Sequence, residues 1–153
     1  LYYNHQNTGR PVPDDNPRFA KFASNYLDVR NGALYPFGYG LSYTTFEYGP
    51  LQISADHTAT VRVTNTGSRA ADEIVQLYIR DKVASISRPV KELKAFRRIH
   101  LAAGESQDVS FQITPDMLKF YNADLQYVLE PGEFDIMVGP NSRDTKNGTI
   151  SVK

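Results

Sequence analysis

Residues 73–81 read EIVQLYIRD, and they decide the fold because their side chains alternate in character. Apolar residues occupy every second position: Val75, Leu77 and Ile79. Since successive side chains of a β-strand point to opposite faces, this period of two predicts a strand with one face in a hydrophobic core. Gln76 and Tyr78 are expected on the opposite face.

The same period extends in both directions along the chain. Upstream, residues 60–64 alternate, and residues 46–48 and 51–53 suggest one strand interrupted by Gly49-Pro50. Downstream, further strands are expected at residues 93–101, 109–113, 119–121, 126–129, 134–138 and 150–152. Almost no helix is expected: a single turn at residues 114–118, while the isolated apolar spacing at residues 17–27 is weak evidence for one more short turn.

Two local departures from regular strand structure are expected. The alternation slips by one position near Ala95-Phe96, which predicts a β-bulge because a bulge places two residues opposite one. At the helical turn, Thr114 is expected to be the N-cap and Pro115 to take the first helical position.

The pattern amounts to about seven to nine short strands at roughly 8–12-residue spacing, with turn signals between them. It predicts an all-β fold, an antiparallel two-sheet sandwich of the fibronectin type III or immunoglobulin kind. The Cys and Trp residues of a true immunoglobulin core are absent, because the chain contains neither type. A jelly roll or a small barrel is the structural alternative.

Composition excludes several classes of function. Seventeen basic residues balance 17 acidic ones, so no basic surplus favours nucleic acid or an anionic membrane as a partner. The absence of cysteine excludes disulfides and thiolate metal sites. No apolar run reaches the length of about 18 residues that a membrane-spanning helix needs.

The first part of the chain lacks any sustained period. Pro11, Pro13 and Pro17 disfavour helix through much of residues 1–34, so we expect an irregular arm that lies on another domain. We therefore divide the chain into a linker or arm, residues 1–45, and a sandwich domain, residues 46–153. A start at Leu1 with no signal region suggests a cut from a longer protein.

The junction between these parts, Tyr35–Phe46, reads YPFGYGLSYTTF, and we call it the aromatic segment. Its glycines and proline make regular structure unlikely to form, so the rings are expected to hold an irregular stretch in place. We expect them to pack against the sandwich. The site candidates, at a domain interface or at a substrate rim where sugar rings stack on aromatic faces, are Tyr35, Phe37, Tyr39 and Tyr43.

No residue pattern indicates catalysis or metal binding. His5, His57 and His100 are far apart in the sequence and have no metal-ligand spacing. Ser42 lies in a sequence similar to a nucleophile elbow, but Thr44 replaces its last glycine. The carboxylate pairs fall in loops or at strand ends, where solvated turn residues are the ordinary interpretation: Asp14/Asp15, Asp72/Glu73 and Glu130/Glu133. We therefore assign no catalytic residue, no metal ligand and no cofactor.

Motifs along nearly the whole chain resemble the C-terminal region of family-3 glycoside hydrolases. They are Tyr2–His5, Gly9–Pro11, Tyr26–Asp28, Leu34–Thr44, Val63–Gly67, Val75–Tyr78, Arg88–Phe96, Leu101–Glu105 and Glu130–Gly132. The sequence is most similar to bacterial periplasmic β-glucosidases, and the resemblance implies a periplasmic or extracellular location. Ala95 departs from the pattern, since similar sequences often carry glycine there.

The resemblance implies a parent enzyme with a barrel that bears the aspartate nucleophile and an α/β domain that contributes the acid/base carboxylate. No position here matches either motif, so this chain alone is expected to lack catalysis. The parent would hydrolyse β-glucosides with retention and without a cofactor. Those two domains would be this chain's partners, and carbohydrate would be met only through the parent.

Two functions follow from different classes. The first is a non-catalytic accessory domain that stabilises a β-glucosidase and shapes its active-site rim or a dimer contact. The alternative is an independent module that binds carbohydrate or protein. That alternative would be favoured by an exposed planar row of strand aromatics, for which the sequence offers Tyr78, Phe96, Tyr121 and Tyr127.

Overall fold

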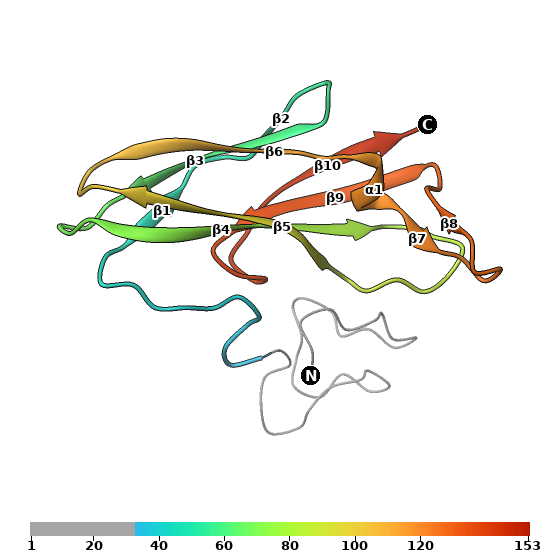
Figure 1. The fold of residues 1–153 in the computed structure, drawn as a ribbon, viewed down its shortest axis with the longest axis horizontal. Coiled ribbons are helices and arrows are strands. Elements are labelled where there is room, and N and C mark those ends of the chain that lie inside the picture. Colours follow the sequence, from blue (N-terminus) through green and yellow to red (C-terminus); the bar gives the residue numbers. More distant parts are fainter. Residues whose placement is uncertain (1–32) are drawn as a thin grey trace, which may run out of the picture.

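Two antiparallel sheets packed face to face account for nearly all of the regular structure in residues 33–153, the part of the chain that the computed structural model describes (Figure 1). The first sheet comprises β1 (Phe46–Tyr48), β2 (Gln52–Ile53), β3 (Thr58–Asn65) and β6 (Ser106–Gln112). The second has the order β10 (Lys146–Val152), β9 (Gly132–Gly139), β4 (Ala71–Asp81) and β5 (Glu92–Leu101). The predicted two-sheet sandwich is confirmed.

A small hairpin lies outside both sheets (Figure 1). Its strands are β7 (Phe120–Tyr121) and β8 (Tyr127–Val128), and they follow the short helix α1 (Pro115–Leu118). Thr114 is the N-cap and Pro115 begins the helical turn, as predicted, although Thr114 makes no side-chain capping hydrogen bond. The backbone carbonyl of Thr114 instead accepts a bond of 3.0 Å from the N–H of Met117.

The predictions for residues 1–32, which include His5 and most of the arm, lie outside the described residues. The first strand begins at Phe46, and the division of the chain at residues 45 and 46 stays a prediction.

The interrupted first strand is confirmed. β1 pairs with the end of β3 at Val63–Asn65, and β2 pairs with its start at Ala59 and Thr60. Between them the N–H of Gly49 still donates to the carbonyl of Arg62 at 2.9 Å. Pro50 interrupts this edge strand because it can donate no ladder hydrogen bond. The bond from Gly49 keeps the interrupted stretch attached to β3.

The predicted bulge is also present, close to its expected position. Leu77 on β4 lies opposite Ala95, whereas the next residue, Tyr78, lies opposite Leu93. Lys94 is therefore the extra residue on β5. The bulge bends β5 locally, and bulges of this kind increase the twist of the strand that carries them.

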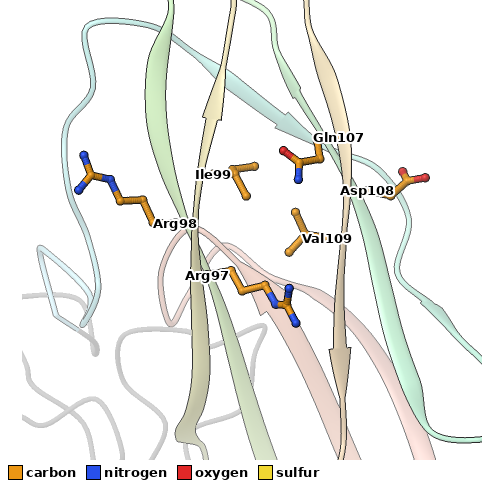
Figure 2. Close-up of a pocket in the computed structure, with 6 residues that line it drawn as sticks. All are labelled: Arg97, Arg98, Ile99, Gln107, Asp108 and Val109. Atoms are coloured by element: carbon orange, nitrogen blue, oxygen red, sulfur yellow. The ribbon is translucent and has the colours of Figure 1, made fainter.

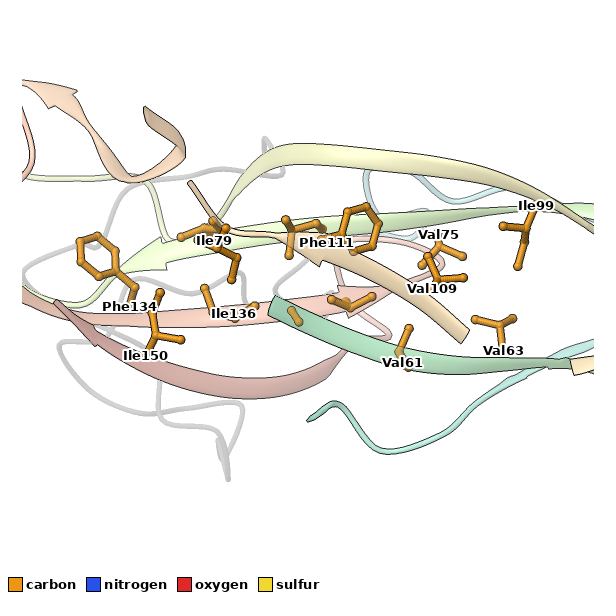
Figure 3. Close-up of a cluster of buried hydrophobic side chains, with 14 of the residues drawn as sticks. Val61, Val63, Val75, Ile79, Ile99, Val109, Phe111, Phe134, Ile136 and Ile150 are labelled. Carbon is orange, nitrogen blue, oxygen red and sulfur yellow. The ribbon is translucent and has the colours of Figure 1, made fainter. Parts of the chain in front are cut away.

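The core lies between the sheets and uses the apolar set of the opening stretch (Figure 3). Val75 and Leu77 of β4 are fully buried and face Val61 and Val63 of β3. Phe111 of β6 completes this contact from the first sheet. Each such side chain contributes about 1.5–3 kcal/mol by leaving water, so the packing of these strands dominates the stability of the domain.

The second face of β4 differs from expectation. Gln76 and Tyr78 do lie on the face opposite the core, but they are buried, with exposed fractions of 5% and 0%. The prediction that Tyr78 could belong to an exposed planar row of strand aromatics is therefore wrong. What buries these residues is the aromatic segment together with the loop after β9.

Candidate functional site

The aromatic segment crosses the outer face of the second sheet, next to β4 (Figure 1). Its predicted site residues keep much of their surface exposed: 68% for Tyr35, 43% for Phe37, 42% for Tyr39 and 93% for Tyr43. The prediction that the rings pack against the sandwich is therefore wrong for Tyr35 and Tyr43. Pro36 is the buried side chain of this stretch, and the backbone makes most of the attachment.

The amide of Gln76 is the central attachment point. Its Nε2 donates to the carbonyl of Gly38 at 3.1 Å and to the carbonyl of Pro140 at 2.6 Å. Its Oε1 accepts a hydrogen bond of 2.5 Å from the hydroxyl of Tyr78. One buried side chain thus joins strand β4, the aromatic segment and the loop after β9, and its polar atoms are satisfied.

The loop after β9 also holds the segment directly. The N–H of Ser142 donates to the carbonyl of Phe37 at 2.9 Å, and the ammonium of Lys91 donates to the carbonyl of Ser142 at 2.5 Å. Burial lowers the pKa of Lys91, and the positive charge of Arg80 lowers it further. The bond to Ser142 partly offsets the cost of burying this ammonium.

Gly38 is required at the attachment point for two reasons. The N–H of Tyr39 donates to the carbonyl of Pro36 at 3.0 Å, which closes a tight turn, and Gly38 within that turn has φ of +78°. A positive φ at this turn position favours glycine. A Cβ on Gly38 would also overlap Oε1 of Gln76 and approach the hydroxyl of Tyr78 to 2.8 Å.

A second attachment lies at the end of the segment. Asn65 is fully buried, and its Oδ1 accepts a hydrogen bond of 2.7 Å from Thr44. Its Nδ2 donates to the carbonyls of Arg69 at 2.7 Å and Leu101 at 3.1 Å. The turn after β3 is therefore fastened to the segment and to β5 at once.

The anchored backbone presents an exposed apolar surface, which we call the aromatic surface. Its members are Leu34, Tyr35, Phe37, Tyr39, Leu41 and Tyr43, with Ile74 and Phe96 on the same face of the adjoining sheet. The rings of Tyr35 and Tyr39 pack at 5.3 Å between centroids with a tilt of 44°. Exposed apolar side chains that gather in this way mark an interaction site, whereas single exposed apolar residues are ordinary.

The sequence did not reveal several residues of this site. Gln76 and Tyr78 read as solvent-facing strand residues, Asn65 as an ordinary turn residue, and Phe96 as part of a bulge. The roles of Gln76 and Asn65 depend on the aromatic segment, whose bonding residues lie 38 and 21 positions away in the sequence. The one signal in the sequence was that Gln76 and Tyr78, two positions apart, share the outer face of a core strand.

Glu73 and Asp72, neighbours on β4, show what the predicted carboxylate pair does in the structure. Among residues 33–153, no three His, Asp or Glu side chains gather as metal ligands would. Glu73 of β4 accepts a hydrogen bond of 2.7 Å from Tyr48 of β1, which ties the two sheets together. Burial raises the pKa of Glu73 and of Tyr48.

Asp72, the neighbour of Glu73, has the opposite environment. It is half-buried and accepts hydrogen bonds from Nε of Arg98 at 2.8 Å, while Nδ1 of His100 lies 2.6 Å from its other oxygen. The bond to Arg98, followed by that to His100, lowers the pKa of Asp72. Adjacent residues therefore point to the core and to solvent, and Asp72 and Glu73 do not form a catalytic pair.

An open hollow of about 270 Å³ lies between strands β5 and β6 (Figure 2). Ile99 and Val109 form its floor, and Arg97 lies with its guanidinium 5.8 Å from the ring of Phe111. The carboxylate of Asp108 at its rim is paired with Arg62 at 2.8 Å. The hollow lies between the edge strands β5 and β6 of the two sheets, and the charge of Asp108 at its rim is already paired.

No helix within residues 33–153 is long and apolar enough to cross a membrane.

The fold and sequence match parts of larger known proteins. The family described as "Fibronectin type III-like domain" matches residues 73–142. A periplasmic beta-glucosidase of Salmonella typhimurium is 45% identical over 99% of this chain and 20% of its own length. A beta-xylosidase of Formosa agariphila is 49% identical over 78% of the chain and 18% of its own length.

A solved structure gives the same result. The crystal structure of a beta-glucosidase from Listeria innocua in complex with gluconolactone superposes with a TM-score of 0.86 at 42% identity. The match covers 99% of this chain and 22% of the beta-glucosidase chain. The present chain thus spans about a fifth of the length of the relatives it matches.

The substitution Gly38→Ala should loosen the aromatic segment, because it strains a positive φ and collides with Gln76. We expect a loss of about 1–3 kcal/mol in the free energy of unfolding and faster proteolysis within residues 33–45. The matched control is Gly40→Ala, since Gly40 has no positive φ and a Cβ there would meet nothing within 4 Å. Equal behaviour of the two variants in urea unfolding and limited proteolysis would contradict the assignment.

Glu73 and Asp72 should affect stability with opposite pH dependence. The raised pKa of Glu73 means that its protonated form favours folding below the unfolded pKa of about 4.3, and that this benefit is lost as pH rises through the folded value. The lowered pKa of Asp72 means that its benefit is present above the unfolded pKa of about 3.9 and is lost as pH falls.

The change in the free energy of unfolding caused by Glu73→Gln, relative to wild type, should therefore be more favourable at neutral pH than at low pH. For Asp72→Asn the change should be less favourable at neutral pH than at low pH. Urea unfolding of both variants from roughly pH 3 to pH 7 measures the two slopes. Slopes of the same sign would refute the environments described here.

Proposed function

Because this chain carries a fibronectin type III-like domain and matches the C-terminal region of family-3 glycoside hydrolases, we propose that it is a non-catalytic accessory domain of a β-glucosidase-type enzyme. The domain stabilises that enzyme through the aromatic surface. The parent hydrolyses β-glucosides with retention of configuration, through a covalent glycosyl-enzyme and without a cofactor. The chemistry belongs to its barrel and α/β domains, which are the partners of this chain.

The observation that carries the proposal is the aromatic surface on its anchored backbone. Eight large apolar side chains are exposed on the segment and the adjoining sheet, although the domain already has a complete core elsewhere. The segment that carries most of them leads directly toward residues 1–32. A surface at the point where the chain continues is well placed to contact the preceding part of the same polypeptide.

The lengths of the relatives support the same proposal. The beta-glucosidases and the beta-xylosidase extend over about five times the length that this chain covers in them. Most of such a parent is therefore available to cover the aromatic surface. The anchoring by Gln76 favours this contact, because a backbone that is already ordered loses less conformational entropy on docking.

Within this interface, Tyr35, Phe37, Tyr39 and Tyr43 are the residues that contact the other domains. Tyr43 is the most exposed of the four, at 93%, and its ring is the one best placed to reach the rim of a neighbouring substrate cleft or a second copy of the enzyme. The name of the Salmonella typhimurium relative supports a periplasmic or extracellular location for the parent.

An independent binding module is the less favoured function. It was expected to show a planar row of exposed strand aromatics, but Tyr78 is fully buried and Phe96 lies beside the aromatic segment. Specific retention of the 153-residue chain on an insoluble glucan, together with no loss of stability in the parent for Tyr35→Ala/Tyr39→Ala, would favour this second function.

The isolated 153-residue chain should not hydrolyse an aryl β-glucoside, whereas the full-length parent should. The reason is that no position in the chain matches the nucleophile or acid/base motifs of the family. Release of the aryl alcohol by equimolar amounts of the two proteins is the measurement. Turnover by the isolated chain at a rate near that of the parent would refute the accessory role.

The double substitution Tyr35→Ala/Tyr39→Ala should destabilise the parent more than the isolated chain. In the isolated chain both rings are substantially exposed, so their removal should change the unfolding free energy by less than about 1 kcal/mol. In the parent, where the rings would be buried against another domain, the loss should reach about 2–4 kcal/mol.

Thermal and urea unfolding of both proteins provide the measurement, and Val83→Ala is the matched control because Val83 is 80% exposed and lies outside the aromatic surface. Equal effects in the parent and the isolated chain would argue against an interface at these residues.

A further inference from the structure

We propose that the tip of the β7–β8 hairpin is a carbohydrate-contact site, at which the ring of Tyr121 stacks on a sugar unit of a β-linked oligosaccharide. The class of ligand rests on the proposed function, since the relatives are named as beta-glucosidases and beta-xylosidases. The site itself rests on the geometry of the hairpin. It lies well separated from the aromatic surface (Figure 1).

The base of the hairpin is firmly attached to the sandwich. Leu118 and Phe120 are buried, with exposed fractions of 5% and 2%. The guanidinium of Arg88 lies 4.6 Å from the centroid of the Phe120 ring and pairs with Glu92 at 2.6 Å. The projecting part, residues 121–127, therefore extends from a rigid support.

The turn at the tip is ordered by its own side chain. Oδ1 of Asn122 accepts hydrogen bonds from the N–H groups of Asp124 at 3.1 Å and Gln126 at 2.9 Å. Leu125 takes a left-handed conformation with φ of 58°, and its side chain is 81% exposed. Glycine or asparagine adopts this conformation at lower cost, so packing within the domain gives no reason for leucine at this position.

Two tyrosines on the hairpin form an exposed pair of rings. Tyr121 and Tyr127 are direct cross-strand partners, and their ring centroids lie 5.0 Å apart at an angle of 40°. The hydroxyl of Tyr127 donates to the carbonyl of Asp116 at 3.2 Å, and the ammonium of Lys119 lies 5.7 Å from its ring. Tyr127 is thus held in place and supports Tyr121.

Tyr121 supplies the open stacking face. It is 62% exposed, while the contacts of Tyr127 are directed toward the base of the hairpin. A sugar ring offers C–H groups on its face and hydroxyls on its edge, so it suits an aromatic ring bordered by polar groups. The side chains of Asp124 and Gln126 border the tip and carry hydrogen-bonding groups for such hydroxyls.

The small size of the tip favours a sugar over a protein partner. A stable protein interface uses about 800 Å² and 20–30 residues on each side, far more than residues 121–127 can offer. One sugar unit, by contrast, covers about the area of a single aromatic ring. The proposal therefore commits to an oligosaccharide, and association with a protein is an outcome that would overturn it.

The test is affinity electrophoresis of the full-length protein in gels that contain soluble mixed-linkage β-glucan or xylan. Wild type should be retarded relative to a gel without polysaccharide. Tyr121→Ala should weaken the apparent binding roughly tenfold or more, whereas Tyr121→Phe should retain it, because stacking needs the ring and not the hydroxyl. Leu125→Gly keeps both rings but removes the exposed leucine side chain, so it should weaken binding less than Tyr121→Ala does.

Val83→Ala is the control, since it removes an exposed side chain, 80% accessible, outside both the hairpin tip and the aromatic surface, and should leave retardation unchanged. Hydrolysis of an aryl β-glucoside by Tyr121→Ala should equal that of wild type. Failure of the hairpin site is therefore distinguishable from failure of the proposed accessory function, which predicts losses for Tyr35→Ala/Tyr39→Ala instead.

A second measurement does not depend on any variant folding correctly. Addition of cellohexaose to the wild-type 153-residue chain should shift the NMR ring resonances of Tyr121 and leave those of Tyr43 unchanged. Several results would overturn the proposal: no retardation of wild type in either gel, unchanged retardation of Tyr121→Ala, loss of binding in Tyr121→Phe, or no shift at Tyr121. Retardation that follows self-association in sedimentation would overturn it as well.

Discussion

Residues 75–79 of strand β4 are buried on both faces, and the rest of the molecule is arranged to meet that constraint. Its inner face packs Val75 and Leu77 against the first sheet, which produces the sandwich. Its outer face places the amide of Gln76 and the hydroxyl of Tyr78 away from water, where each polar atom needs a partner. The carbonyls of Gly38 and Pro140 meet that need, so burial of the second face fixes the path of the aromatic segment.

Attachment through backbone groups has a consequence for the side chains. Because carbonyls of the segment make the hydrogen bonds to Gln76 and Ser142, the rings of Tyr35 and Tyr43 are not needed to hold it. The segment is ordered while its apolar side chains stay outward. The same residues thus provide a stable path for the chain and, in the proposed function, a surface for another domain.

The sequence predicted those features of the fold that depend on the local pattern of residues. The period of two identified the strands, the Gly49-Pro50 interruption and the bulge near Ala95, because each depends on neighbouring residues. It did not predict the burial of Gln76 or Asn65, since each acquires its partners from residues distant in the sequence. Thr114 shows a different limit of sequence reasoning. It takes the N-cap position that its residue type suits, yet its side chain makes no capping bond and the turn closes through the backbone alone.

The residues with positive φ differ in what selects their side chains: packing within the domain at some positions, and not at others. At Gly38 the backbone approaches Gln76 so closely that no Cβ fits, and glycine is required. At Gly104 the same conformation occurs in open space, where glycine relieves strain in an ordinary turn. His57 also has a positive φ, and its carbonyl accepts a hydrogen bond from Ile113. Leu125 takes this conformation with its side chain in solvent, where neither crowding nor a core contact selects an apolar residue. A leucine kept at that cost beside two exposed tyrosines is better explained by what the hairpin contacts than by how the domain folds.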